Sequence, residues 1–123
     1  MNGNSIVLDT NIILYLLGGN KDLFSILNEM ELFVSIISEI ELLGFKGLSQ
    51  SDKKKINLFL SECTIVPLNT EVKGICISIK QKNKSKTPDA IIAATALHLK
   101  IPLITADKEF EKIDNLDLFL YQF

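Results

Sequence analysis

Two aspartates follow predicted strands at positions where their side chains could share a site. Asp9 comes directly after the apolar run 5–8, and Asp107 follows the apolar run 103–105 after one residue. Both runs have the continuous apolar character of strands that are buried on both faces. Because the carboxyl ends of parallel strands lie at one edge of a sheet, where α/β proteins bind ligands, the spacing predicts two carboxylates at that edge.

A third carboxylate, Asp89, lies in the first turn of a helix predicted over residues 87–100. A carboxylate there can simply stabilise the helix dipole. However, at about 100° per residue Asp89 aligns with Ala93 and Ala96, and a face of such small side chains indicates close packing. His98 falls about 180° from Asp89 on the same helix, so we expect it to be a surface or partly buried residue outside the site.

A fourth carboxylate is predicted on a helix over residues 35–45. Ile37, Ile40 and Gly44 form the expected inward stripe of this helix, and Glu41 falls about 40° from Ile37, at the edge of that stripe. Glu39 lies on the opposite side and is interpreted as a solvated charge. A partly exposed Glu41 without a partner is the alternative to a role in the site.

Together these acids favour a metal site, because an unpaired buried charge is costly and grouped carboxylates destabilise a fold unless a cation lies between them. The chain has no arginine that could neutralise them. Oxygen ligands without histidine or cysteine suit Mg²⁺ or Mn²⁺ rather than zinc. Ions held in this way activate water and bind phosphoryl oxygens during phosphodiester cleavage.

The elements that would position the acids alternate between strands and helices. Predicted strands cover residues 5–8, 32–34, 64–66, 103–105 and 118–123, and predicted helices cover 11–17, 21–30, 35–45, 51–63, 70–82, 87–100 and 107–113. The alternation predicts an α/β fold with a parallel sheet covered on both faces. The length of 123 residues corresponds to a single domain, 1–123.

Several helix details are also predicted. Ser51 is the expected N-cap of the helix over 51–63. Thr87 is the expected N-cap of the helix over 87–100, with Pro88 at its first position. Leu23, Phe24 and Leu27 are expected on one apolar side of the helix over 21–30.

Composition excludes several classes of protein. Hydrophobic residues make up 47% of the chain and charged residues 23%, which indicates a folded domain. The two cysteines and one histidine lack the spacing of a zinc site and suit a reducing compartment. The sequence has neither the pattern of a signal peptide nor an apolar run of about 18 residues. We therefore expect a cytoplasmic protein without a membrane segment.

Charge at first weighs against a nucleic-acid partner, since thirteen lysines face fifteen acids and the net charge is −2. Setting the four candidate acids aside leaves eleven acids against thirteen lysines. Four lysines, Lys80, Lys82, Lys84 and Lys86, alternate along the segment that leads to Asp89. They are either a solvated charge run or a track that binds an RNA backbone.

Four stretches, taken in order, match a known family: IVLDTNIILYLL (6–17), VSIISEIELLGF (34–45), KTPDAIIAATALHLKIPLIT (86–105) and TADKEF (105–110). Through them the chain resembles PIN-domain ribonucleases, and within these the VapC-like toxins of bacterial type II toxin–antitoxin modules. The resemblance implies a three-layer α/β/α domain with a short parallel sheet of five or so strands. It also implies that Asp9, Glu41, Asp89 and Asp107 are catalytic and bind Mg²⁺ or Mn²⁺.

The resemblance further implies metal-dependent hydrolysis of RNA phosphodiester bonds, with Asn11 and Thr105 orienting carboxylates or a metal-bound water. A helix-start residue and a strand residue are the plain alternatives for these two positions. A homodimer and a cognate antitoxin are the implied partners. Leu14, Leu17 and Phe24 could line the antitoxin groove or the dimer interface, although a place in the core is the favoured interpretation.

Three other functions fit parts of the pattern. A haloacid dehalogenase-type phosphatase would need an aspartate where Asn11 stands. A non-catalytic PIN-fold binding module would usually have lost one of the acids, all four of which are present here. A PIN-domain nuclease that processes RNA or DNA without a toxin role shares the same site chemistry, so the residues alone leave it open.

Overall fold

The computed structural model describes residues 4–122. The strands are β1 (Ser5–Leu8), β2 (Glu31–Ser35), β3 (Thr64–Val66), β4 (Leu103–Thr105) and β5 (Leu118–Leu120). The helices are α1 (Thr10–Leu17), α2 (Lys21–Leu27), α3 (Ile36–Leu43), α4 (Gln50–Ser61), α5 (Thr70–Lys82), α6 (Thr87–Leu99) and the short 3₁₀ helix η1 (Lys108–Lys112). Every predicted element is present. Phe123, the predicted end of the last strand, lies outside the described residues.

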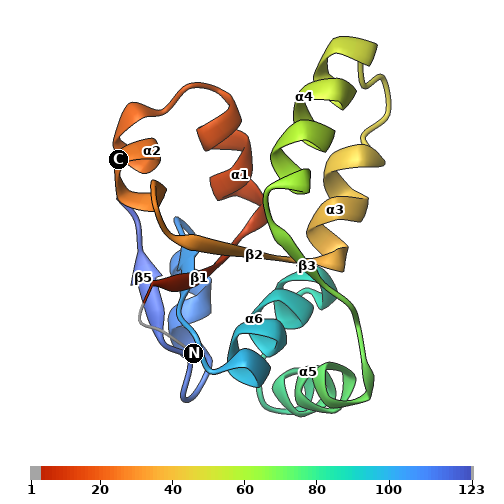
Figure 1. Ribbon diagram of the computed structural model, residues 1–123. Coiled ribbons are helices and arrows are strands. Elements are labelled where there is room, and N and C mark those ends of the chain that lie inside the picture. The colour runs from red at the N-terminus through yellow and green to blue at the C-terminus, as the bar shows by residue number, and fades with distance from the viewer. Residues whose placement is uncertain (1–3, 123) are drawn as a thin grey trace.

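The strands form one parallel sheet in the order β3-β2-β1-β4-β5 (Figure 1). In the centre, Val7 of β1 lies opposite Phe33 of β2 on one side and Leu103 of β4 on the other. From β1 the chain first adds β2 and β3 on one side of the sheet and later adds β4 and β5 on the other side. The direction in which strands are added therefore reverses between β1 and β4. In open α/β sheets a crevice forms at such a point, beyond the carboxyl ends of the strands.

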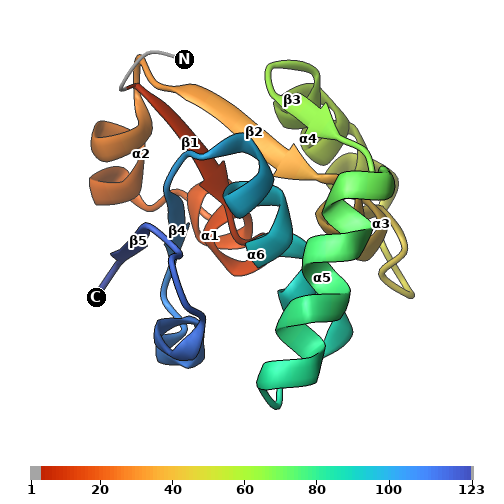
Figure 2. The same cartoon turned by 90° about the horizontal axis from the view of Figure 1, so that it is seen from below.

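Helices cover both faces of the sheet, which confirms the predicted three-layer α/β/α fold (Figures 1 and 2). Successive strand residues point to opposite faces, and β1 shows the consequence. Val7 packs into the core cluster beneath α5 and α6, whereas Ile6 and Leu8 pack into the cluster formed with α1, α2 and α4. All of β1 is buried, as expected for a central strand of a parallel sheet.

Helix α6 is buried along most of its length because it lies between the sheet and α5. Every residue from Ala90 to Ala96 is buried, so the close packing predicted for Ala93 and Ala96 is confirmed. The Thr95 hydroxyl donates a hydrogen bond to the Ile91 carbonyl, 2.8 Å away, and is thereby satisfied within the helix. His98, in the last turn, is half-buried, as predicted.

Two predicted helix caps are wrong. Ser49 rather than Ser51 caps α4, because its hydroxyl is the one that accepts the Asp52 N–H, at 3.0 Å. Thr87 is the first helical residue of α6, and Lys86 occupies the cap position without a side-chain hydrogen bond. The Pro88 that follows fits the first turn because it has no N–H to satisfy.

Two predicted inward faces are confirmed only in part: Leu23 and Leu27 of α2 are buried and Ile37 of α3 packs against the core, but Phe24 and Ile40 are exposed. In α2, Leu23 and Leu27 are four residues apart and turn toward the sheet, which leaves Phe24 61% exposed. In α3, the buried residues are Ser38 and Leu42, whereas Ile40 is 58% exposed. Helix α3 follows β2 directly and packs against α1, α4 and α6, and the side that carries Ile40 is left exposed.

None of the helices in residues 4–122 is both long and apolar enough to cross a membrane.

Candidate active site

Asp9 and Asp107 meet at the carboxyl edge of the sheet because β1 and β4 are neighbouring strands. The Asp9 backbone N–H donates to the Ile104 carbonyl at 3.0 Å, which extends the pairing of these strands to the aspartate itself. The Asp9 residue is only 5% exposed. Its position is therefore determined by the centre of the fold and not by a mobile loop.

The Asp9 carboxylate is held by hydrogen bonds at both oxygens. Oδ1 accepts the Thr10 N–H at 2.8 Å, which also caps α1, and Oδ2 accepts the Thr105 hydroxyl at 2.6 Å. Thr105 is fully buried, and its Oγ1 accepts the Asp107 N–H at 3.0 Å. One threonine side chain thus orients the first acid and positions the backbone of the last.

Glu41 is held by two hydroxyl groups in series. Ser38 Oγ lies 2.8 Å from Thr10 Oγ1, and Thr10 Oγ1 donates to Glu41 Oε1 at 2.8 Å. Because Thr10 has one hydroxyl hydrogen, the Ser38 hydroxyl must donate to Thr10 when Thr10 donates to Glu41. Glu41 is exposed rather than partly buried at the edge of the inward stripe, and Glu39, predicted to be a solvated charge, is the more buried of the two glutamates.

The four acids line one cavity of about 590 Å³. Asp89 reaches it from the first turn of α6, at the end where α6 meets α3. The opposite wall is mainly apolar and belongs to α1, α3, α4 and the loop that joins the last two. The other residues that line the cavity are Thr10, Asn11, Leu14, Leu17, Gly18, Leu42, Phe45, Leu48, Asp52, Lys55 and Ile56.

Burial and mutual repulsion raise the pKa of two of these acids. The pKa of Asp9 is raised first by burial and then by the Asp89 and Asp107 carboxylates, against the opposing hydrogen bonds from Thr105 and Thr10. Burial also raises the pKa of Asp89, and the charges of Asp107 and Glu41 add to this. A cation between these groups would relieve both effects.

The donor set fits a hard divalent cation, since it consists of carboxylate oxygens that destabilise one another without one. Residues 4–122 contain no group of three or more histidine, cysteine, aspartate or glutamate side chains arranged to hold a metal ion. The four acids thus share a cavity without closing around a single point.

Sequence reasoning missed several residues around the cavity. Thr10 and Ser38 support Glu41, and their positions beside Asp9 and one helical turn before Glu41 were the available signal. Asp52 and Lys55 line the cavity from α4, which no motif indicated. Asn11 also lines it but is exposed, and residues 4–122 provide no hydrogen bond between its side chain and an acid.

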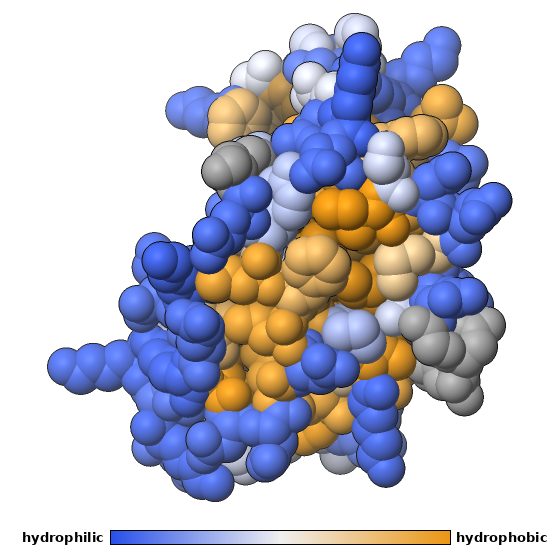
Figure 3. Space-filling view, turned by 90° about the vertical axis from the view of Figure 1, so that its left-hand side faces the viewer, coloured by the Kyte–Doolittle hydropathy of each residue, from blue (hydrophilic) through white to orange (hydrophobic). Residues whose placement is uncertain are grey.

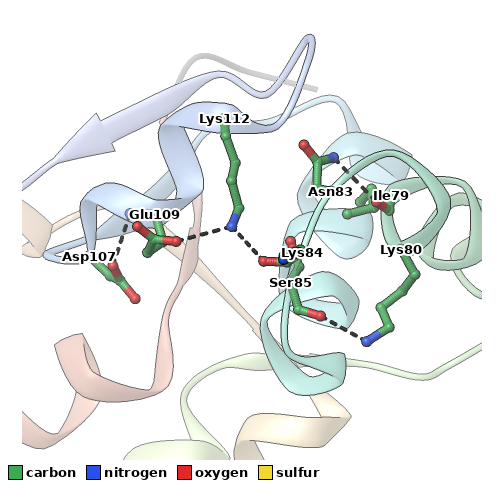
Figure 4. Close-up of polar contacts among 8 residues, drawn as sticks. All are labelled: Ile79, Lys80, Asn83, Lys84, Ser85, Asp107, Glu109 and Lys112. Carbon is green, nitrogen blue, oxygen red and sulfur yellow. Dashed lines mark hydrogen bonds and ion pairs between the residues drawn. The ribbon is translucent and has the colours of Figure 1, made fainter.

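The four predicted RNA-binding lysines do not form one uniform track. Lys80 Nζ donates to the Ser85 carbonyl at 2.8 Å, so this ammonium holds the loop between α5 and α6 (Figure 4). Lys82, Lys84 and Lys86 are exposed. Of these four lysines, only Lys86 lowers the pKa of Asp89. Lys112, which is outside the set, has the same effect.

Comparison with known proteins gives a consistent family match. A model of the PIN domain matches residues 6–116. A chain in a toxin–antitoxin complex from Klebsiella pneumoniae matches with a TM-score of 0.82 and 26% identity, over 96% of this chain and 99% of that chain. VapBC-1 from nontypeable Haemophilus influenzae contains a match with a TM-score of 0.81 and 27% identity, over 94% and 97%.

The same fold occurs in VapBC2 from Rickettsia felis, which was solved bound to a DNA fragment from its promoter. Its matching chain has a TM-score of 0.86 and 20% identity, over 96% of this chain and 99% of that chain. No curated protein sequence matches the chain.

Proposed function

The chain belongs to the PIN domain family, and from this premise we propose that it is an endoribonuclease dependent on Mg²⁺ or Mn²⁺. The observation that supports the proposal is the single cavity that Asp9, Glu41, Asp89 and Asp107 share, in which burial and repulsion raise the pKa of two acids. A cavity with this charge is suited to divalent cations and, through them, to phosphate groups.

In this proposal the four acids hold the metal, and each is positioned by the chain. Thr105 and the Thr10 N–H orient the Asp9 carboxylate, and the Thr10 hydroxyl orients Glu41. A bound divalent ion would supply an activated water and neutralise charge on the phosphate oxygens. The buried position of Asp9 removes bulk water from one side of the site, which strengthens the electrostatic interactions there.

The direct test is incubation of the purified chain with a single-stranded RNA in Mn²⁺ or Mg²⁺, with a chelator as the control. Cleavage that requires the ion supports the proposal. Cleavage of single-stranded DNA in place of RNA would favour the alternative of a DNA-processing PIN nuclease, and absence of any cleavage would favour a non-catalytic PIN-fold binding module.

We further propose that the chain is the toxin of a type II toxin–antitoxin pair, since its structural neighbours come from such complexes. The apolar wall of the cavity supports this assignment. Leu14 lines it while 49% exposed, and Phe45 while 70% exposed, so the core position favoured for Leu14 is wrong. An antitoxin helix with an apolar face could bind along this wall and block the acids.

The toxin assignment predicts growth arrest when the chain is induced in a bacterial host. We expect no arrest with Asp9→Asn, because arrest depends on the acidic site. Co-expression of the small gene beside the native reading frame should restore growth. Normal growth of the induced wild type, with the protein confirmed in the cells, would instead favour an RNA- or DNA-processing role.

A homodimer is also part of the proposal. Figure 3 shows hydrophobic residues gathered on the side of the molecule that carries α2 and β5. Phe24 of α2 is 61% exposed and Phe119 of β5 is 42% exposed. An apolar surface of this kind is usually covered by another protein surface.

Cys63 and Cys76 are free thiols, which suits a cytoplasmic location for the assembly.

Neutralising Lys82, Lys84 and Lys86 together should weaken RNA binding and flatten its dependence on salt. Each lost phosphate contact should reduce the slope of log affinity against log salt by about 0.7 for a single strand. The measurement is a titration of labelled RNA at several salt concentrations. Unchanged affinity and slope would show that these lysines are a solvated charge run.

A further inference from the structure

A second cavity, of about 150 Å³, shares two acids with the first but has a different chemical lining. Asp89 and Asp107 separate the two, and three lysines lie around the smaller one. Its lining residues are Lys84, Ser85, Lys86, Asp89, Asp107, Glu109, Phe110, Lys112 and Ile113. Figure 4 shows that the loop after α5 and the helix η1 approach one another here.

Lys112 connects the two sides of this second cavity. Its Nζ donates to the Lys84 carbonyl in the loop and, at 3.0 Å, to Glu109 Oε1 on its own helix (Figure 4). An ammonium has three N–H donors, and residues 4–122 offer the third one no acceptor. One donor of Lys112 therefore remains available for a ligand. Lys86 is exposed at the rim, and its Nζ forms no hydrogen bond within the same residues.

Ser85 provides an independent sign that a polar ligand is missing. Among residues 4–122, its Oγ is the only buried side-chain oxygen or nitrogen without a hydrogen-bond partner. A buried polar group without a partner destabilises a fold by more than a made hydrogen bond contributes. Ser85 also lines the cavity, so its hydroxyl is a candidate donor to a ligand bound there.

The start of α6 adds a further feature. Each of the helices α1–α5 has a side-chain cap, whereas α6 begins at Lys86 without one. Pro88 has no N–H, so Thr87 and Asp89 carry the first-turn N–H groups that a cap would satisfy, and the start of this 13-residue helix favours an anion beside the Asp89 carboxylate already there. Lys86 and Asp89, both in this first turn, line the second cavity.

The net charge around the second cavity depends on whether cations occupy the acidic site. Three lysines face Asp89, Asp107 and Glu109, so the formal charges cancel in the free chain. Glu109 is 74% exposed and already paired with Lys112. Divalent ions held by Asp89 and Asp107 would leave the cavity positive, and it would then attract an anion.

We propose that this second cavity binds a phosphate group of the RNA strand beside the bond that is cut. The inference rests on the proposed function and extends it, because it assigns one position of the substrate to named residues. The ligands are the ammonium groups of Lys86 and Lys112, the Ser85 hydroxyl and the first turn of α6. Lys80, which holds the loop from outside, is excluded from the set.

The test compares Lys86→Met and Lys112→Met with Lys73→Met, which removes an exposed lysine of α5 that lies in neither cavity. Steady-state cleavage of a short RNA with one cut site should show KM raised about tenfold in each cavity variant, as expected for a charge-assisted hydrogen bond. Because these lysines bind substrate away from the cut bond, kcat should stay close to the wild-type value. Lys86→Arg, which retains the charge, should restore KM.

The phosphate itself is located with modified RNAs. One neutral methylphosphonate linkage is placed at each position in turn, and a separate RNA lacks its 5′ phosphate. A single modification should raise KM for the wild type and have no further effect in Lys112→Met. An effect at an internal linkage identifies a phosphodiester as the ligand, and an effect of the 5′ end identifies a terminal phosphate.

Equal KM values in the two cavity variants and Lys73→Met would overturn the inference while RNA cleavage stood. If the chain cleaves no RNA, titration with inorganic phosphate in Mg²⁺, followed by NMR, decides the matter separately. Amide shifts confined to Ser85, Lys86, Thr87, Asp89 and Lys112 that vanish in Lys112→Met would uphold the phosphate site. Absence of such shifts would overturn it.

Discussion

Replacing Asp9 with asparagine should lower the rate of RNA cleavage by at least about a hundredfold. Loss of a residue that only supports a metal ligand typically costs about 10- to 100-fold in activity or metal affinity, so loss of a buried ligand should cost more. The asparagine oxygen can still accept one of the two hydrogen bonds from Thr10 and Thr105. The variant therefore changes charge more than shape.

The same variant should not unfold the protein. Burial and two neighbouring carboxylates raise the pKa of Asp9, so the charged form is disfavoured in the folded chain. Removing that charge should leave the metal-free melting temperature at neutral pH unchanged or higher. Asp114→Asn, at an exposed position outside both cavities, is the matched control and should retain full activity. A purified Asp9→Asn protein with wild-type cleavage would refute the catalytic assignment.

Saturating Mn²⁺ or Mg²⁺ should raise the melting temperature of the wild type markedly. An ion at a hundredfold excess over its Kd stabilises a folded state by about 2.7 kcal/mol. For a domain of this size that corresponds to a rise of roughly 10 °C. Asp89→Asn should lose most of the rise, whereas Glu39→Gln, which changes the glutamate of α3 outside the cavity, should retain it. Equal shifts in the two variants would mean that the ion binds elsewhere.

The stability of the folded chain should depend on pH in opposite directions with and without the divalent ion. The pKa values of Asp9 and Asp89 are raised in the folded chain, so the folded state holds these protons more tightly than the unfolded chain. Their contribution to stability is present at low pH and is lost as pH rises from the ordinary value of 3.8 through the raised values. Metal binding requires the charged carboxylates, so stabilisation by the ion should instead weaken on acidification.

The sequence was most informative where local pattern and topology agree. Asp9 and Asp107 follow apolar runs that had to be buried strands, and a parallel sheet then placed both acids at one edge. Ala93 and Ala96 indicated a packed face on α6, and α6 is indeed buried there. These inferences need only the alternation of strands and helices, which implies a parallel sheet, and helix periodicity, and the sequence carries both directly.

Glu41 was chosen partly from a predicted inward stripe that the structure bears out only at Ile37. Helix α3 turns Ser38 and Leu42 inward in place of Ile40 and Gly44, and Glu41 is exposed while it lines the cavity. Periodicity identifies an apolar stripe but not which neighbours are there to cover it. The packing of α3 depends on α4, the next helix along the chain, and on α6, which is far away in sequence.

The second cavity could not have been predicted. Lys112 lies 28 residues from Lys84, and their contact depends on how η1 folds back toward the loop after α5. The alternation of lysines over residues 80–86 suggested one uniform surface. The structure separates Lys80, which holds the loop, from Lys84 and Lys86, which line the cavity.

Cleavage of RNA by the acidic cavity is tested most directly by mapping new RNA 5′ ends in cells after brief induction. Wild type and Asp9→Asn should be induced to equal protein levels and compared. New 5′ ends that accumulate at defined sites with the wild type and are absent with Asp9→Asn would agree with the proposed function. The same set of ends in both strains, or none in either, would contradict it.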